Sequence, residues 1–125
     1  MKIIVLKFGG TSVGNIERIK KVSNIIGSYI KRGHKVIIVS SAMSGVTNEL
    51  IKKSQKICSD FDKAEYDALV SSGEQISCAL ISARLKFLGY KSRSYLGWQV
   101  PILTDMNYGN AKILSIFKNK LTNFI

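Results

Sequence analysis

The segment KFGGTSVG, residues 7–14, has the composition of a phosphate-binding loop. Lys7 supplies a cation, while Gly9 and Gly10 allow backbone bends that direct N–H groups toward an anion. The apolar run of residues 3–6 places Lys7 near the end of an expected buried strand, where an ammonium group needs an anion or water nearby. Taken alone, the segment fits a lysine that reaches solvent beside an ordinary turn equally well.

The order of residues in this segment differs from that of the two best-known phosphate motifs. No GK[ST] follows the glycines, which excludes the Walker-type loop, and GxGxxG is absent, which excludes the dinucleotide fingerprint. The residues therefore leave open a phosphate loop of another kind, in which the lysine precedes the glycines.

Two more segments carry polar groups suited to the same site. SSAMSGVTN, residues 40–48, is either a polar wall for a small substrate or a flexible loop in which Thr47 caps the next helix. Glu74 lies in SSGEQIS, which we expect to open a helix with Ser72 and Gln75 as a capping box. Its carboxylate is then either the partner of a substrate ammonium or a first-turn acid stabilised by the helix dipole.

The apolar pattern predicts a β-α-β-α arrangement that positions these segments. Residues 3–8 and 35–40 are typical of buried parallel strands, residues 16–30 form an amphipathic pattern capped by Asn15, and a second helix is expected from residue 48. Ligands of open parallel sheets bind at the carboxyl ends of the strands, so the two loops and Glu74 are expected at one rim. The predicted fold class is α/β, with a mainly parallel sheet and helices on its faces.

The second half of the chain carries weaker signals. We expect a third helix over residues 62–70 and a fourth from SSGEQIS to about residue 89. SRSYL, GWQVPILTD and AKILSI are strand-like, with a turn over residues 107–110, and FKNKLTNFI resembles a short helix. So few strands indicate part of a larger domain. The buried stripe of the fourth helix is expected to consist of Ile76, Leu80, Ala83 and Phe87.

Composition narrows the class of protein. The chain has 125 residues, 46% of them hydrophobic, and a formal net charge of +11. Its lysines are scattered over several predicted elements and outnumber the arginines, which favours a solvated surface over a nucleic-acid-binding face. The first apolar run is too short for a signal peptide and no later one could span a bilayer, so we expect a cytoplasmic location. Cys58 and Cys78 lack metal-ligand spacing, and no protein metal site is predicted.

The three motifs together resemble one family. KFGGTSVG, SSAMSGVTNEL (40–50) and SSGEQIS (71–77) match, in order and spacing, the motifs of the aspartokinases, and GWQVPILTD with YGNAKI resembles the stretch that follows them. The resemblance covers essentially all of residues 1–125. It implies the α/β/α sandwich of the amino-acid kinase (carbamate kinase-like) fold, here incomplete. Residues 1–125 would be the amino-terminal, aspartate- and phosphate-binding part of the catalytic domain, with the rest of that domain and the ACT regulatory domains absent.

The resemblance also implies a reaction. Aspartokinases transfer the γ-phosphoryl group of ATP, with Mg²⁺ held through the nucleotide phosphates, to the side-chain carboxylate of L-aspartate. The product is 4-phospho-L-aspartate, in the first step toward lysine, threonine and methionine and, in bacteria, diaminopimelate. Family members are usually homo-oligomers, and neither nucleic acid nor a membrane is an expected partner.

Residue roles follow from the same resemblance. Lys7 matches the motif lysine that contacts the transferring phosphate, and is the expected catalytic residue. Thr47 and Glu74 match the aspartate-binding threonine and glutamate, with Glu74 pairing with the α-ammonium. The other residues of the expected ATP-phosphate pocket are Phe8, Gly9, Gly10 and Ser41.

Three alternatives stay open at this point. The chain could belong to another amino-acid kinase that acts on glutamate or a carbamoyl group, or be a non-catalytic basic fragment that binds nucleic acid or a protein. It could also be a gene remnant that does not fold alone. We expect negligible kinase activity from these residues by themselves.

Overall fold

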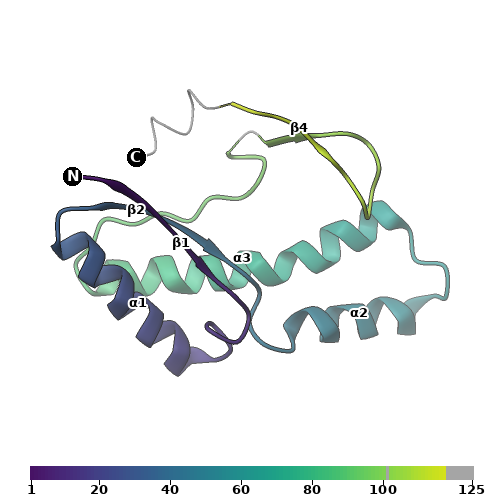
Figure 1. Cartoon of the computed structure of the whole chain (residues 1–125). Coiled ribbons are helices and arrows are strands. Elements are labelled where there is room, and N and C mark those ends of the chain that lie inside the picture. Colours follow the sequence, from purple (N-terminus) through teal and green to yellow (C-terminus); the bar gives the residue numbers. More distant parts are fainter. Residues whose placement is uncertain (101, 118–125) are drawn as a thin grey trace.

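The computed structural model describes residues 1–100 and 102–117. It begins with the predicted β-α-β unit, formed by strand β1 (Ile3–Phe8), helix α1 (Ile16–Lys31) and strand β2 (Lys35–Ser40). The strands pair in parallel, with Phe8 opposite Ser40 at their carboxyl ends (Figure 1). Asn15 caps α1 as predicted, because its side-chain oxygen accepts a hydrogen bond of 2.9 Å from the Arg18 amide. The loops after both strands therefore meet at one rim.

Helix α2 (Val46–Ile57) begins slightly earlier than the expected start at residue 48. Gly45 occupies its N-cap with φ of 83°, a left-handed conformation that favours glycine. Thr47 therefore lies inside the first turn of α2, and the alternative in which it caps the helix is wrong.

Helix α3 (Lys63–Phe87) is continuous over 25 residues, where two helices were predicted. Asp62 caps it, accepting hydrogen bonds from the Ala64 and Glu65 amides at 2.8 and 3.0 Å. The expected capping box at Ser72 is wrong, since the Ser72 hydroxyl donates within the helix to the Leu69 carbonyl at 2.7 Å. Small and hydroxyl-bearing residues in SSGEQIS are typical of the start of a helix. Here their side chains form hydrogen bonds within the helix or face a neighbouring loop.

The core lies between α1, α3 and one face of the β1–β2 pair. Helix α1 contributes Ile19, Val22 and Ile26, and α3 contributes Ile81 and Leu85. Leu6, Phe8, Val36 and Ile38 pack against them from the strands.

The predicted buried stripe of α3 is wrong. Ile76 and Phe87 are 50% and 79% exposed, and Ala83 is exposed as well, so only Leu80 of that set packs against the core. Apolar residues occur on more than one side of α3, so spacing alone did not decide which side is buried. The buried side consists of Gly73, Ser77, Ile81, Ser82 and Leu85.

The two strands are buried on one face only, contrary to the expectation of strands buried on both. Among the described residues, Ile3, Val5 and Val39 on the other face are 57%, 62% and 48% exposed. Both α1 and α3 pack on the face that carries Leu6 and Ile38. The parallel pairing is therefore as predicted, while the alternating exposure of β1 resembles that of a sheet covered on one side.

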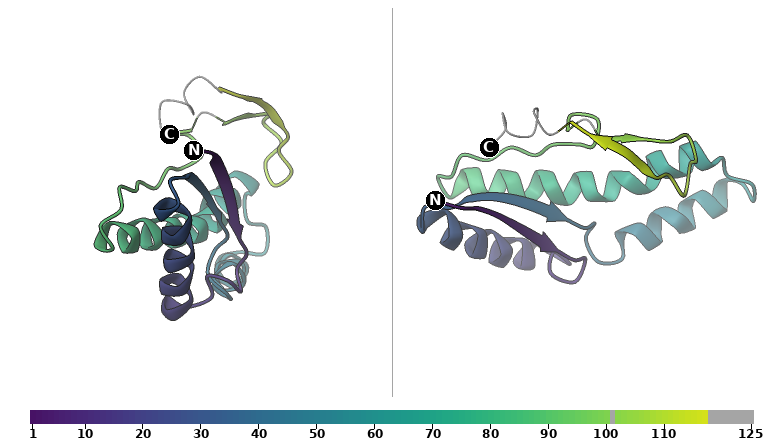
Figure 2. Two further views of the ribbon diagram at one scale, coloured as in Figure 1. Left: turned by 60° about the vertical axis from the view of Figure 1, so that its left-hand side comes forward. Right: turned by 45° about the horizontal axis from the view of Figure 1, so that its top comes forward.

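Strands β3 (Ile102–Thr104) and β4 (Ile113–Ile116) form a separate antiparallel hairpin. Figures 1 and 2 show it on the opposite side of α3 from α1 and α2. The predicted turn is present, and its Gly109 amide donates to Asp67 Oδ2 of α3 at 2.8 Å. SRSYL is not a strand, and residues 97–100 form turns. The helix predicted for FKNKLTNFI lies almost entirely outside the described residues.

No helix in the described part of the chain combines the length and the apolar character needed to cross a membrane.

Candidate functional site

An open cleft of about 460 Å³ lies at the carboxyl ends of β1 and β2. Its walls come from segments far apart in the sequence, namely the loop after β1, the loop after β2 with the start of α2, and the middle of α3. Among the predicted site residues, Gly10, Ser41, Thr47 and Glu74 line it together. The rim expected from the sequence therefore exists. The other lining residues are Thr11, Ala42, Met43, Ser44, Gly45 and Asn48.

The first wall is a compact turn after β1. The Ser12 and Val13 amides donate to the Gly9 carbonyl at 2.9 and 3.3 Å, which folds the backbone back on itself. A Cβ atom at Gly10 would lie 3.2 Å from the Ala42 carbonyl oxygen, so the glycine lets the two loops approach closely. This is the kind of small-residue turn that brings backbone groups near an anion.

The second wall is tied to the first through the backbone. The Ser41 amide donates to the Phe8 carbonyl at 2.9 Å, which continues the pairing of β1 and β2 one residue beyond the strands. The Val46 amide donates to the Met43 carbonyl at 3.1 Å, closing the turn into α2. Because α2 begins at Val46, the half-buried Thr47 is held on a helix rather than on a free loop.

Glu74 reaches the cleft from the middle of α3, so the prediction that it sits at a helix amino end is wrong. Its Oε1 atom accepts a hydrogen bond of 3.3 Å from the Ala42 amide. Gly73, the preceding residue, is buried against the second wall, and a Cβ atom there would lie 2.9 Å from the Ala42 Cβ. The close approach at Gly73, rather than a helix dipole, places the Glu74 carboxylate beside the loop.

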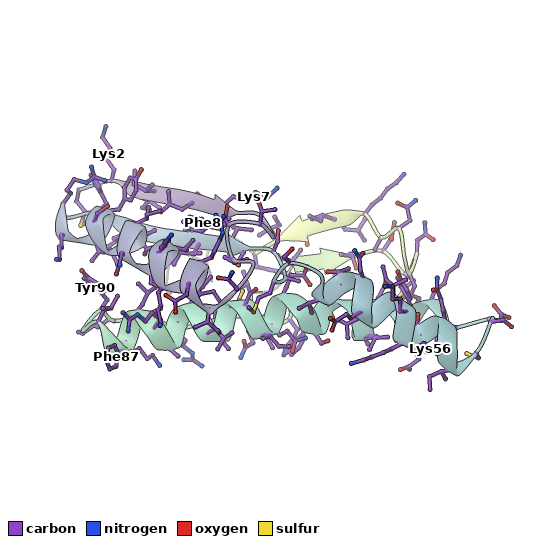
Figure 3. All side chains as sticks on the ribbon, turned by 90° about the horizontal axis from the view of Figure 1, so that it is seen from below. Lys2, Lys7, Phe8, Lys56, Phe87 and Tyr90 are labelled. Atoms are coloured by element: carbon purple, nitrogen blue, oxygen red, sulfur yellow. The ribbon has the colours of Figure 1, made fainter. Side chains whose placement is uncertain are left out.

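Lys7, Phe8 and Gly9 do not line the cleft. Figure 3 shows Lys7 at the end of β1 that faces α2, with Lys2 at the other end. Lys7 and Phe8 lie on opposite faces of the strand, since Lys7 is exposed and Phe8 packs against the core. The Lys7 ammonium therefore needs no anion to offset burial, because its face of the sheet is open to solvent.

Sequence reasoning missed several residues that build the site. Gly73 and Ser77 belong to SSGEQIS, whose pattern predicts a helix start, and the motif pattern assigns Asn48 no role in the site. Gly73, directly before Glu74, is the sequence feature that could have indicated the site, because a glycine inside a helix often marks close packing against another segment.

Cys78 lies one helical turn beyond Glu74, and its thiol is affected both by burial and by the charge of Glu74. Burial of the thiol and the nearby Glu74 carboxylate both raise the pKa of Cys78. Among residues 1–100 and 102–117, no group of three or more His, Cys, Asp and Glu side chains is placed to hold a metal ion. Among the described residues that line the cleft, Glu74 is the only one with a carboxylate side chain.

A comparison with family models matches residues 2–125 to the amino acid kinase family. The chain belongs to the amino acid kinase family. This match confirms the broader family, the amino-acid kinases, that the resemblance implied.

Individual relatives are aspartokinases. An aspartokinase of Geobacillus stearothermophilus is 47% identical over 116 residues, which cover 93% of this chain and 28% of the relative. One from Rickettsia felis is 43% identical over 128 residues, covering all of this chain and 32% of the relative. The chain thus spans about a third or less of the length of these relatives.

A solved structure also resembles the fold. The crystal structure of aspartate kinase from Synechocystis superposes with a TM-score of 0.66 at 42% sequence identity, covering 69% of this chain and 15% of that one. This likeness confirms the α/β fold class, of which the described residues form a small and incomplete version with a parallel β1–β2 pair.

Proposed function

We propose that residues 1–125 form the amino-terminal, aspartate- and phosphate-binding part of an aspartokinase catalytic domain. The observation that carries the proposal is the meeting of Gly10, Ser41, Thr47 and Glu74 in one cleft, from three separate motifs. The names of the similar proteins support the same substrate. The reaction is transfer of the ATP γ-phosphoryl group to the side-chain carboxylate of L-aspartate, giving 4-phospho-L-aspartate in the first step of lysine, threonine, methionine and diaminopimelate biosynthesis.

In the proposed substrate half of the cleft, a negatively charged carboxylate and a hydroxyl group bind L-aspartate. Glu74 binds the α-ammonium of L-aspartate. Because its carboxylate is anchored on a helix beside a polar loop, it can form a directional, charge-assisted hydrogen bond with that group. Thr47 is held in the first turn of α2, and its hydroxyl donates a hydrogen bond to the substrate. These contacts orient the substrate so that its side-chain carboxylate faces the turn after β1.

The proposed phosphate half is the turn after β1. Lys7 neutralises charge on the transferring phosphoryl group, while the backbone around Phe8, Gly9 and Gly10, with Ser41, surrounds the ATP phosphates. A carboxylate nucleophile needs no general base, so catalysis consists mainly of positioning and charge neutralisation. Since Lys7 does not line the cleft, reaching the phosphate requires its flexible side chain to extend over the end of β1.

The cleft offers few side chains that could act as ligands for Mg²⁺. Glu74 is the only carboxylate that lines the cleft, and no cluster of ligating side chains occurs in the described residues. We propose that the ion is held through the nucleotide phosphates, as Mg²⁺ commonly is in kinases, and assign it no protein ligand in this chain. A cytoplasmic location and assembly into homo-oligomers belong to the same proposal.

A chimera tests the proposal. In it, this chain replaces the matched 28% of the Geobacillus stearothermophilus aspartokinase. Trapping the acyl phosphate with hydroxylamine should show turnover that depends on L-aspartate and ATP and is absent with L-glutamate. The 125-residue chain alone should give negligible turnover. A chimera that prefers L-glutamate, or one that is folded but inactive, would count against the assignment.

Lys7→Ala in the same chimera tests the catalytic role. The loss of a charge that stabilises the phosphoryl group in flight should lower kcat by roughly 100-fold to 1,000-fold. Lys2→Ala is the matched control, because Lys2 lies at the far end of the same strand (Figure 3). Equal turnover of the two variants would show that Lys7 has no such role.

A further inference from the structure

The Ser41–Ala42 peptide group is held at both ends by side chains of α3. At one end, the Ser77 hydroxyl lies 2.7 Å from the Ser41 carbonyl oxygen. At the other end, the Ala42 amide donates to Glu74 Oε1 at 3.3 Å. The carbonyl and amide of a trans peptide point in opposite directions, so the two contacts fix the plane of this one peptide.

The two contacting side chains are three residues apart on one helix, which places them on the same face. Ser77 is fully buried, with 0% exposure, whereas Glu74 lines the cleft. The Ser40 hydroxyl adds a second donor to the Ser41 carbonyl at 3.1 Å and lies 3.4 Å from the Ser77 hydroxyl. The Ser77 hydroxyl also lies 3.0 Å from the Glu74 carbonyl oxygen of its own helix, so this end of the arrangement is polar and hydrogen-bonded.

Space for this arrangement comes from the buried side of α3. A Cβ atom at Gly73 would meet Ala42 Cβ at 2.9 Å and Val46 Cγ1 at 3.2 Å. Any larger residue there would push the helix away from the loop and lengthen both hydrogen bonds. The loop and the helix thus approach closely at the residue before Glu74.

We propose that Ser77 is a positioning residue for the substrate's ammonium group, acting through the Ser41–Ala42 peptide on Glu74. By fixing the Ser41 carbonyl, Ser77 turns the Ala42 amide toward Glu74 Oε1. That hydrogen bond sets the orientation of the carboxylate and leaves Oε2 to bind the ammonium. Ser77 itself touches no substrate. This inference rests on the proposed function, which assigns the ammonium to Glu74.

The test measures ligand discrimination by the 125-residue chain. L-aspartate and succinate are titrated by NMR, since succinate has the same carboxylates but no ammonium group. Ser77→Ala should weaken L-aspartate binding roughly fivefold to tenfold, the effect of one lost buried hydrogen bond, and leave succinate binding unchanged. Amide hydrogen exchange at Ala42 should become several-fold faster.

Two further variants separate positioning from general damage. Ser77→Cys replaces the hydroxyl with a somewhat larger thiol that is only a weak donor, and should show the same loss of discrimination even if Ser77→Ala folds poorly. Ser23→Ala is the matched control, because Ser23 is also 0% exposed but its hydroxyl bonds only within α1, to the Ile19 carbonyl at 2.8 Å. It should leave both affinities at their wild-type values.

The outcomes distinguish this inference from the proposed function. Equal weakening of both ligands, or an unchanged ratio with unchanged Ala42 exchange, would overturn the role of Ser77. If the wild-type chain does not prefer L-aspartate over succinate, the assignment of Glu74 to the ammonium fails. In that case the Ala42 exchange rates still decide whether Ser77 holds the peptide.

Discussion

At the scale of single residues, the cleft depends on small side chains as much as on charged ones. Ser41, Thr47 and Glu74 could be predicted from residue type, and all of them line one cleft. Gly73 could not be predicted, because its role is defined by Ala42 and Val46 across the interface rather than by its own chemistry. A contact between distant segments leaves no local signature.

Gly73→Ala should destabilise the chain. The added methyl group would meet Ala42 Cβ at 2.9 Å, and the loop cannot retreat easily because the Ala42 amide is bonded to Glu74. Overpacking costs about 1–3 kcal/mol, which exceeds the helix-propensity gain of up to about 1 kcal/mol. Urea unfolding should show a net loss of about 1–2 kcal/mol. Gly97→Ala, with nothing within 4 Å, is the control, and an equal effect of both changes would contradict the close approach.

The Cys78 thiol should report the charge of Glu74. Burial raises the pKa of Cys78 first and the Glu74 carboxylate raises it further, so little thiolate is present at pH 8. Iodoacetamide should therefore modify the exposed Cys58 before Cys78. Glu74→Gln removes one cause of the raised pKa, so alkylation of Cys78, followed by mass spectrometry, should accelerate. Glu65→Gln removes the same charge several turns away and should change nothing; a slower reaction in Glu74→Gln would refute the coupling.

At the scale of elements, helices and strands with strong local sequence signals were predicted correctly, and those with ambiguous signals were not. β1, α1 and β2 have sharp caps, stops and uniform apolar runs, and their predicted and observed bounds agree within a residue. In α3, hydroxyl residues that mimic a helix start lie in the interior of a continuous helix. Apolar residues on several sides of α3 then left the buried side undetermined, since tertiary packing chooses it.

A pair of substitutions on α3 tests which side is buried. Leu85 is 1% exposed, so Leu85→Ala should cost about 2–5 kcal/mol in the free energy of unfolding. Phe87 is 79% exposed and contacts the Arg84 guanidinium at 4.9 Å from its ring centre. Phe87→Ala should therefore cost less than about 1 kcal/mol, the scale of an exposed cation–π contact. Denaturant titration of both variants checks the order, and a larger loss for Phe87→Ala would restore the stripe predicted from the sequence.

At the scale of the whole molecule, family membership was readable from the motifs, whereas the exposed surfaces were not. The continuous apolar runs predicted strands buried on both faces, yet Ile3, Val5 and Val39 are open to solvent. The hairpin adds Leu103 and Leu114, at 53% and 64% exposure. Which face of a strand is covered depends on the elements that pack there, and the sequence of the strand alone does not contain that information.

These surfaces predict self-association that depends on salt in a definite direction. Exposed apolar patches favour association, while a net charge of +11 opposes it through repulsion between copies. Raising NaCl from 50 to 500 mM shortens the Debye length from about 14 Å to about 4 Å and screens that repulsion. The apparent mass of the 125-residue chain, measured by light scattering at micromolar concentration, should therefore rise with salt. Val5→Lys on the open sheet face should reduce the rise. A mass that falls with salt would instead indicate association held together by charge.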